Sequence, residues 1–320
     1  MAQFIDHDAV RQTLGWSDAI DLLEEMSRHE AAGRTFVSPK FNSDFETGSM
    51  RILFAADYVA GYGATKAYHT IAGIGSRYLV SLIDIKTGEL LAIIDGRRIT
   101  DLRTGAASGV VARKLGFDRP VSVGIIGSGH QARAQLESLA AACDIKAAAV
   151  FSPSARNREK FASELGERLG IDIEAVGSAE AAARGHDIVA AATKSRSAVP
   201  VLLGKWLEDC RLLCAVGNTR AQFNEIDNQC FQDAGLVIVD SRHALDEAGE
   251  LIQAVASGAL REYAWMTLAA LGNDSVPPDG LVIFKSVGTA LQDLALAGEC
   301  YERLRDSDHV PVFPDLDCSG

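Results

Sequence analysis

A glycine-rich segment near the middle of the chain has the residue types and spacing of a dinucleotide-binding loop. Residues 127–132 match G-x-G-x-x-A, and they stand directly between an apolar run and a helical pattern. Here Gly127 permits a tight turn, Gly129 lets a pyrophosphate approach the backbone, and Ala132 allows close packing of helix on strand. A plain turn is the alternative. The phosphates would face the free N–H groups of the helix N-terminus, with contacts expected from Gly127, Ser128, Gly129, His130, Gln131 and Ala132.

The residues after the next apolar run favour NADP over NAD. NAD enzymes usually place Asp or Glu there to hold the ribose 2′-hydroxyl. Residues 150–158 instead read Val-Phe-Ser-Pro-Ser-Ala-Arg-Asn-Arg, without an acid. Because Arg can pair bidentately with a 2′-phosphate, we expect NADP (as NADPH), with NAD possible, and contacts from Ser152, Ser154 and Arg156. The alternative is that Arg156 and Arg158 are solvated residues of the following helix.

Strand and helix patterns alternate around this loop. Continuous apolar runs suit a parallel sheet that is buried on both faces, and their alternation with helices predicts a doubly wound α/β fold. The expected strands are 121–127, 147–152, 171–176, 187–193, 212–217, 236–240 and 281–284, with helices over 130–142 and 155–169. Ligands of such sheets lie beyond the carboxyl ends of the strands. Further cofactor contacts are therefore expected from Thr193, Val216, Gly217, Lys285, Val287 and Gly288.

The first hundred residues predict a different, α+β organisation. Ser17 is the expected N-cap of a helix over 18–32, and Thr100 that of a helix ending at Gly116. Short turns, including Lys86-Thr87-Gly88-Glu89, join the apolar runs between these helices, which indicates a largely antiparallel sheet. The expected strands are 51–58, 64–71, 77–85 and 90–94, and a closing helix covers 289–305.

Length and composition indicate about two globular domains and exclude several classes of protein. The 320 residues carry 31 basic and 43 acidic side chains, a net charge of −12. An acidic chain repels nucleic acid and anionic lipid, and no run of 18 apolar residues predicts a membrane span. The first residues lack the pattern of a signal peptide, so we expect a cytoplasmic protein. Its six cysteines show no zinc spacing and are expected to be reduced thiols, with no metal site.

Five motifs in order give the chain a family resemblance. They are ITDLRTGAASG (99–109), VGIIGSGHQA (123–132), AVGNTRAQFNEID (215–227), DSRHALDEAGEL (240–251) and FKSVGTALQDLALA (284–297). The chain resembles the ornithine cyclodeaminase/mu-crystallin family over nearly its whole length. The resemblance implies a homodimer that pairs through the sheets of the N-terminal domains. It also implies that residues 1–117, completed by 290–320, form a substrate-binding and dimerisation domain, and that 118–289 form an inserted Rossmann-type domain.

The family's shared chemistry is hydride transfer at a carbon that bears nitrogen and a carboxylate, and it assigns roles to individual residues. Arg103 lies in the family's Leu-Arg-Thr motif, in the first turn of its expected helix, and should clamp the carboxylate. Lys66 matches the family's substrate lysine and is expected to contact the carboxylate and donate a proton. Without the resemblance, a lysine in a strand would be interpreted as a charge at the edge of the sheet that discourages aggregation. Arg51 is the expected third cation, with Lys40 as the alternative, and Thr104 should contact the cofactor.

One departure from the family pattern narrows the expected reaction. Cyclodeaminases of the family carry an acid where this chain has Thr219, and a hydroxyl is no comparable base. Ketimine reductases of the family have a small hydroxyl residue there. We therefore expect NADPH-dependent reduction of a small cyclic imine carboxylate such as Δ1-pyrroline-2-carboxylate or Δ1-piperideine-2-carboxylate. The alternatives are an alanine or opine-type dehydrogenase, an ornithine cyclodeaminase, and a non-catalytic NADP-dependent binding protein.

Overall fold

The computed structural model describes residues 1–272, 279–307 and 309–314, which divide into two units. The first unit comprises Met1–Arg103 and Thr289–Gly320, and the second comprises Thr104–Gly288. In the chain, the second unit is therefore inserted between two segments of the first. The boundary falls inside helix α3 (Gly96–Leu115), whereas the sequence analysis placed it after residue 117.

The first unit is built on a mostly antiparallel sheet. Its strand order is β16-β1-β7-β6-β5-β4-β2, β3 also pairs with β4, and β1 with β7 is the parallel pair. The turn expected at 86–89 joins β6 to β7, which pair antiparallel. The strands are β1 (Ala2–Ile5), β2 (Thr35–Val37), β3 (Phe41–Phe45), β4 (Gly48–Asp57), β5 (Tyr62–Ile71), β6 (Gly75–Asp84), β7 (Leu90–Asp95) and β16 (Val312–Phe313).

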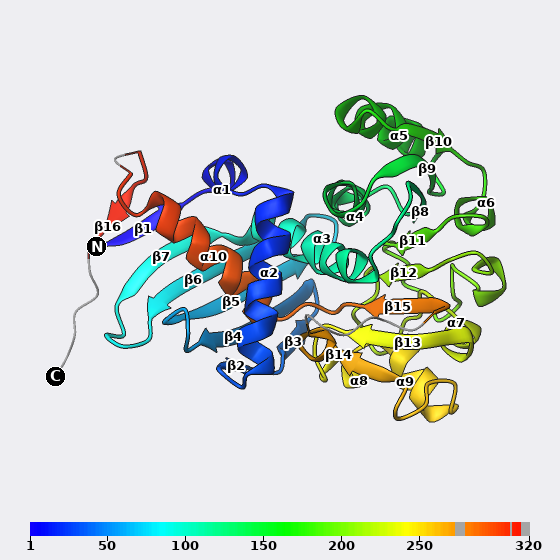
Figure 1. Cartoon of the computed structure of the whole chain (residues 1–320). Coiled ribbons are helices and arrows are strands. Elements are labelled where there is room, and N and C mark those ends of the chain that lie inside the picture. The colour runs from blue at the N-terminus through cyan, green and yellow to red at the C-terminus, as the bar shows by residue number, and fades with distance from the viewer. Residues whose placement is uncertain (273–278, 308, 315–320) are drawn as a thin grey trace. The chain divides into compact units, whose positions relative to one another are not determined.

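One face of this sheet forms a core with helices from both ends of the chain. Helix α10 (Ala290–Leu304) packs on β4 and β5 and beside α2 (Trp16–Ala31), so segments far apart in sequence lie together (Figure 1). Alternate residues such as Leu53 and Val80 are buried, while neighbours such as Ile52 and Leu79 are exposed on the other face. Helix α1 (His7–Thr13) also packs on α10.

Two helix starts differ from the expected ones. Helix α2 begins at Trp16 with Gly15 as its N-cap, and Asp18 closes the capping box instead of Ser17 serving as the cap. Helix α3 begins at Gly96, so Thr100 lies inside it rather than at its N-cap. The Thr100 hydroxyl donates instead to the carbonyl of Gly96 at 2.6 Å. A Thr hydroxyl can accept from a backbone N–H at a cap or donate to a carbonyl within a helix, which explains the error at Thr100; at α2 the carboxylate of Asp18 accepts from the N–H of Gly15 instead.

The second unit has the doubly wound architecture that the sequence predicts. Its strands pair in parallel in the order β10-β9-β8-β11-β12-β15-β13-β14. The first five follow the Rossmann order 3-2-1-4-5, which reverses direction between β8 and β11. These strands are β8 (Val121–Ile126), β9 (Ile145–Phe151), β10 (Asp172–Ala175), β11 (Ile188–Ala191), β12 (Leu212–Ala215), β13 (Ala234–Val239), β14 (Trp265–Thr267) and β15 (Leu281–Lys285).

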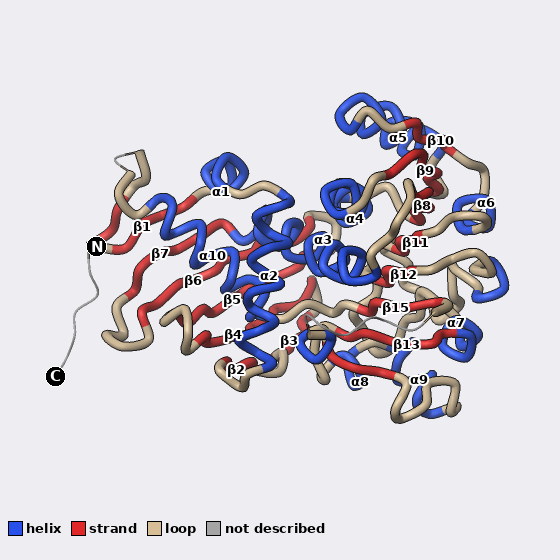
Figure 2. The backbone as a smooth tube through the Cα atoms, viewed as in Figure 1, coloured by secondary structure: helices blue, strands red, loops and turns tan. Residues whose placement is uncertain are grey.

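Helices alternate with these strands along the chain (Figure 2). They are α4 (His130–Ala142), α5 (Ala155–Leu169), α6 (Ala179–Ala183), α7 (Asn228–Asp233), α8 (Ala244–Glu247) and α9 (Gly249–Ala256). Among the described residues no helix has the length and apolar character needed to cross a membrane. Five cysteines are free thiols, Cys143, Cys210, Cys214, Cys230 and Cys300, and Cys318 lies outside the described residues.

The contact between α6 and β8 depends on the absence of a side chain at Gly124. A Cβ at this position would lie 1.8 Å from the carbonyl oxygen of Ala182, whereas a Cβ at Gly177 would meet no atom within 4 Å. We predict that Gly124→Ala lowers the free energy of unfolding by about 1–3 kcal/mol. Gly177→Ala should change it by less than about 0.5 kcal/mol. Urea unfolding of both variants checks this, and equal stability would contradict the packing described.

Candidate functional site

The Gly127–Ala132 loop connects β8 to α4 at the switch point of the second unit's sheet. Gly127 has a φ of 121°, its N–H donates to the carbonyl of Phe151 at 2.8 Å, and a Cβ there would lie 2.5 Å from the oxygen of Ala192. Gly129 is the N-cap of α4 and makes no side-chain cap hydrogen bond, and a Cβ there would meet nothing within 4 Å. The loop therefore has the open backbone and helix N-terminus that fit a dinucleotide pyrophosphate.

The segment that follows β9 presents hydroxyls and arginines. The Ser128 hydroxyl donates to that of buried Ser152 at 3.0 Å, which links the glycine loop to the end of β9. Ser154 is the N-cap of α5. Arg158 donates to the carbonyl of Ser152 at 3.0 Å, while the side chain of Arg156 is exposed. Among the described residues, the exposed guanidinium of Arg156 is therefore a candidate to meet an additional phosphate here.

A buried carboxylate that the sequence analysis missed joins the ends of two strands. Glu225 accepts hydrogen bonds from the N–H (2.7 Å) and hydroxyl (2.8 Å) of Thr193, after β11, and from the N–H of Gly217 (2.8 Å), after β12. Burial raises the pKa of Glu225, and nearby Lys285 opposes this effect. Val216 adds a backbone hydrogen bond to Ala191 at 2.9 Å. The carboxyl ends of β11 and β12 are therefore fixed to each other.

Lys285, expected to contact the cofactor, forms an ion pair inside the second unit. Its ammonium lies 2.8 Å from Glu250, both side chains have no exposed surface, and it donates to the carbonyl of Asn218. The side-chain amide of Asn218 donates to Glu250 in turn. These contacts hold the loop that carries Thr219. The side chain of Thr219 is half-buried. The pairing of Glu250 was not predicted because no local sequence pattern distinguishes a buried acid from an exposed one.

Asp240 organises the last segment of the second unit. It lies after β13, and its carboxylate accepts hydrogen bonds from the hydroxyl of Ser286 (2.7 Å) and from the N–H groups of Val287 (2.9 Å) and Gly288. The sequence alone predicts no binding or catalytic role for this aspartate. Thr104 is buried in the same unit, where its carbonyl accepts from Gln135 at 3.1 Å.

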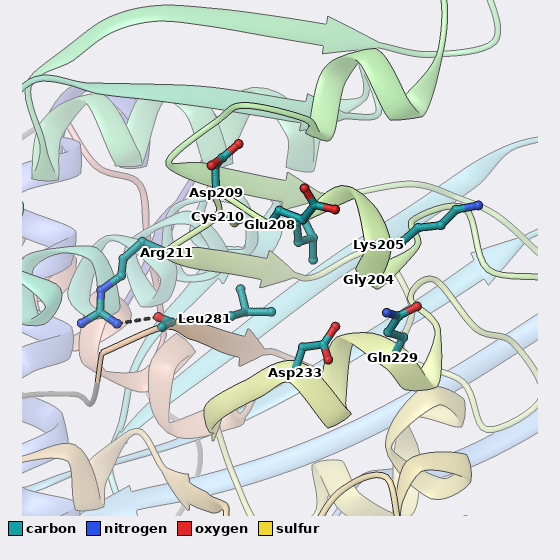
Figure 3. Close-up of a pocket in the computed structure, with 11 residues that line it drawn as sticks. Gly204, Lys205, Glu208, Asp209, Cys210, Arg211, Gln229, Asp233 and Leu281 are labelled. Atoms are coloured by element: carbon teal, nitrogen blue, oxygen red, sulfur yellow. Dashed lines mark hydrogen bonds between the residues drawn. The ribbon is translucent and has the colours of Figure 1, made fainter.

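A cavity of about 500 Å³ lies at the opposite end of the same sheet (Figure 3). Its lining includes Arg211, directly before β12, and Leu281, the first residue of β15. Arg211 donates to the carbonyl of Gly280, as the dashed line shows. Because dinucleotides bind beyond the carboxyl ends of such strands, this cavity at the amino ends is not the candidate cofactor site.

In the first unit, Lys66 lies in the buried centre of the sheet. Its strand, β5, runs between β4 and β6, so the alternative interpretation of Lys66 as an edge charge is wrong. Its side chain is 3% exposed, and its ammonium donates to Asp293 at 2.6 Å and to the hydroxyl of Thr100 at 2.7 Å. Burial lowers the pKa of Lys66 to about 8, and the carboxylate of Asp293 opposes this effect.

Arg103 and Arg51 are among the arginines of this unit whose Nε is unsatisfied within the described residues. Arg103 lies 3.8 Å from Asp293, and its buried Nε has no hydrogen-bond partner among the described residues. Arg51 donates to the hydroxyl of Tyr68 at 3.3 Å, but its Nε is likewise buried and unpartnered there. Lys40 is close enough to lower the pKa of Lys66. Lys40 is thus near Lys66, while Arg51 and Lys66 each lie 5.8 Å from the centre of the Tyr68 ring.

Arg103 is not in the first turn of its helix. Helix α3 begins at Gly96, seven residues earlier. The helix dipole acts mainly within the first turn, so the expected contribution of the dipole to anion binding at Arg103 is wrong. The attraction for an anion comes instead from the cations themselves.

No group of three or more potential metal ligands occurs among residues 1–272, 279–307 and 309–314.

A Rossmann-type unit inserted into an α+β unit with buried cations defines an α/β protein of the dinucleotide-binding class. The chain belongs to the ornithine cyclodeaminase/mu-crystallin family, whose sequence pattern matches residues 2–308. It is 29% identical over 309 residues to the alanine dehydrogenase of Archaeoglobus fulgidus, covering 93% of this chain and 94% of that protein. It is 30% identical over 231 residues to a Δ1-pyrroline-2-carboxylate reductase of Bacillus cereus, covering 70% of each.

A solved structure shares the fold of nearly the whole chain. The Δ1-pyrroline-2-carboxylate reductase of Thermococcus litoralis, in complex with NADH and L-proline, superposes with a TM-score of 0.90 at 27% identity. The match covers 97% of this chain and 100% of that one. These relatives are oxidoreductases that act on carbon–nitrogen bonds.

The ion pair between Lys285 and Glu250 gives a direct test of the second unit's buried network. Glu250→Gln would remove the carboxylate that pairs with a fully buried ammonium, so we predict a loss of about 3–5 kcal/mol in the free energy of unfolding. Glu180→Gln breaks the exposed pair with Arg184 and should cost less than about 1 kcal/mol. Denaturant unfolding measures both, and a loss at Glu250 no larger than at Glu180 would refute the importance of the pair.

Proposed function

We propose that the protein is an NADPH-dependent reductase of a small cyclic imine carboxylate, of the Δ1-pyrroline-2-carboxylate or Δ1-piperideine-2-carboxylate type. The observation that carries the proposal is the cation cluster of the first unit. Arg103 and Arg51 each have a buried N–H without a hydrogen-bond partner among the described residues, and Lys66 is buried near Arg103. A buried unsatisfied donor on a cation is costly in isolation and is satisfied by an anionic ligand such as a carboxylate.

The proposed roles follow from this charge distribution. Arg103 clamps the substrate carboxylate, Lys66 contacts it and supplies the proton that keeps the imine nitrogen cationic, and Arg51 is the third cation. A pKa of about 8 lets Lys66 be protonated at neutral pH and yet give up its proton readily. When bound, the nicotinamide supplies the hydride to the imine carbon. The product is the cyclic amino acid.

The cofactor contacts are proposed for the second unit. The glycine loop would hold the pyrophosphate, and Ser152, Ser154 and Arg156 would surround the ribose 2′-phosphate. Thr193, Val216, Gly217 and the segment Lys285–Gly288 would line the nicotinamide side, with Thr104 nearby in the chain after Arg103. Lys285 would act there by fixing the backbone of Asn218, since its ammonium is already paired.

Two other reactions of the family are less well supported. Deamination of ornithine would need a base where Thr219 stands, and a hydroxyl is a poor base near neutral pH. An alanine dehydrogenase is the second candidate, because a relative with that name aligns over 93% of the chain. A non-catalytic NADP-dependent binder would use the same cations and differ by the absence of turnover.

We further propose a cytoplasmic homodimer that forms through the first unit. The sheet face opposite α2 and α10 exposes several large apolar side chains, including those of Phe41, Met50, Ile52 and Phe54. Such a patch is typical of an interface between subunits.

The test of the proposed reaction is NADPH oxidation with imines and amino acids. We predict rapid turnover of the cyclic imines, and little with pyruvate plus ammonia or with ornithine. Arg103→Ala and Lys66→Ala should each lower kcat/KM by about two or more orders of magnitude, because each removes a charged contact to the reacting species. Arg97→Ala, which removes a partly exposed arginine of the same helix, is the matched control and should keep wild-type activity.

Two results would contradict these assignments. Full activity of both variants would remove Arg103 and Lys66 from the site. Preference for pyruvate plus ammonia would favour the dehydrogenase, and cofactor binding without any turnover would favour the binding protein.

Cofactor preference is tested at Arg156. If this exposed guanidinium meets the 2′-phosphate, Arg156→Ala should raise the Kd for NADPH by about tenfold, the effect of losing one charge-assisted hydrogen bond. Its Kd for NADH should not change. Fluorescence titration with both cofactors measures this, and tighter binding of NADH than NADPH by the wild type would overturn the NADP assignment.

A further inference from the structure

A carboxylate that no sequence motif had assigned lies at the centre of the cation cluster. Asp293 is in the first turn of α10, and its side chain is 3% exposed. The N-terminus of α10 is fixed by a capping box between Thr289 and Gln292. Asp293 therefore lies on a capped, buried helix start. One of its oxygens lies 2.6 Å from the Lys66 ammonium and 3.8 Å from Arg103 Nε.

The hydrogen bonds around Lys66 fix the direction of its ammonium. The Thr100 hydroxyl gives its own proton to the carbonyl of Gly96 at 2.6 Å, so it must accept from Lys66 at 2.7 Å. The carboxylate of Asp293 accepts a second hydrogen bond from the Lys66 ammonium. The third N–H of Lys66 has no acceptor among the described residues and is left for a ligand or for proton transfer. Without Asp293 the ammonium would be held at one point and could rotate about it.

The charges around Lys66 make this carboxylate necessary. The groups that face it are Asp293 on α10, Arg103 on α3, Lys40 between β2 and β3, and the rings of Tyr68 on β5 and Tyr78 on β6 at 5.8 and 5.3 Å. Asp293 is the one anion in this described set, and two further cations repel the ammonium. Lys66, Arg103, Lys40 and Asp293 together keep an excess of positive charge, which favours an anionic substrate.

We propose that Asp293 is the positioning residue of the imine-reducing site, which aims the Lys66 ammonium and keeps it charged beside Arg103. The inference rests on the proposed function for its catalytic consequence, but not for its effect on Lys66. Asp293 acts through Lys66 and makes no contact with substrate. Its loss should therefore change the pH at which Lys66 loses its proton, beyond any loss of packing.

The pH profile of kcat/KM separates positioning from a merely structural role. Reduction requires the protonated lysine, so the wild-type rate should fall as pH rises through about 8, the pKa of Lys66. Asp293→Asn removes the opposing negative charge, which disfavours the ammonium, and the descending limb should move to lower pH by about one to two units. Asp293→Glu retains the charge, so its limb should stay within about half a unit of wild type although kcat falls.

Two controls isolate the charge. Thr100→Val removes the other hydrogen-bond acceptor of the Lys66 ammonium without changing the charge. The descending limb of its pH profile should stay near that of the wild type. Asp18→Asn deletes a different carboxylate that also pairs with α10, through Arg303 at 2.9 Å, and should leave the profile unchanged. An unchanged limb in Asp293→Asn would overturn the inference. If Asp293→Asn does not fold, a descending limb shifted to lower pH in Asp293→Glu would overturn the inference.

A titration that needs no turnover distinguishes failure of this inference from failure of the proposed function. The protein is labelled with ¹³C at lysine Cε, Lys66→Arg identifies the Lys66 signal, and the titration is read by NMR. A lower pKa of Lys66 in Asp293→Asn supports the inference even if the wild type reduces no imine. An unchanged pKa refutes it even if the wild type is an active reductase.

Discussion

The first unit is organised around one buried ammonium that a single carboxylate compensates. Lys66 is on a central strand, where an unpaired charge would be strongly unfavourable, and Asp293 reaches it from a helix that is 227 residues further along the chain. This pair joins the sheet to α10, and Thr100 adds α3 to the same contact. Since Arg103 shares the carboxylate only at 3.8 Å, the cluster keeps donors available for an anionic ligand.

The second unit uses the same principle with different residues. Its strands end in loops whose backbone N–H and C=O groups need partners, and buried Glu225, Asp240 and the Lys285–Glu250 pair provide them. Buried hydrogen bonds of this kind restrict the loops that they join, although Oδ1 of Asp240 has no hydrogen-bond partner among the described residues. They hold fixed the loops from which a dinucleotide would be bound, at the carboxyl ends of the sheet, while the glycine loop leaves the space that the pyrophosphate needs.

Local sequence patterns were enough to predict much of this organisation. The glycine loop, the apolar strands that alternate with helices, and the antiparallel sheet all depend on residues close in sequence, and the structure confirms them. The family resemblance directed attention to Lys66 and Arg103. Their partners were missed because Asp293 and Thr100 meet Lys66 only through the tertiary fold. Glu225 and Glu250 were missed for the same reason. The start of α3 was misplaced because a Thr hydroxyl can bond to the backbone either at a cap or within a helix, and that of α2 because Asp18 rather than Ser17 bonds to its first N–H.

The central claim is that the cations of the first unit bind a substrate carboxylate. A crystal structure of the complex with NADP⁺ and L-proline tests it most directly, because L-proline is a stable cyclic amino acid of the product type. The proline carboxylate is expected within hydrogen-bonding distance of both Arg103 and Lys66, with Asp293 still hydrogen-bonded to the Lys66 ammonium. A proline carboxylate bound by other residues, with Arg103 Nε still unpaired, would contradict it.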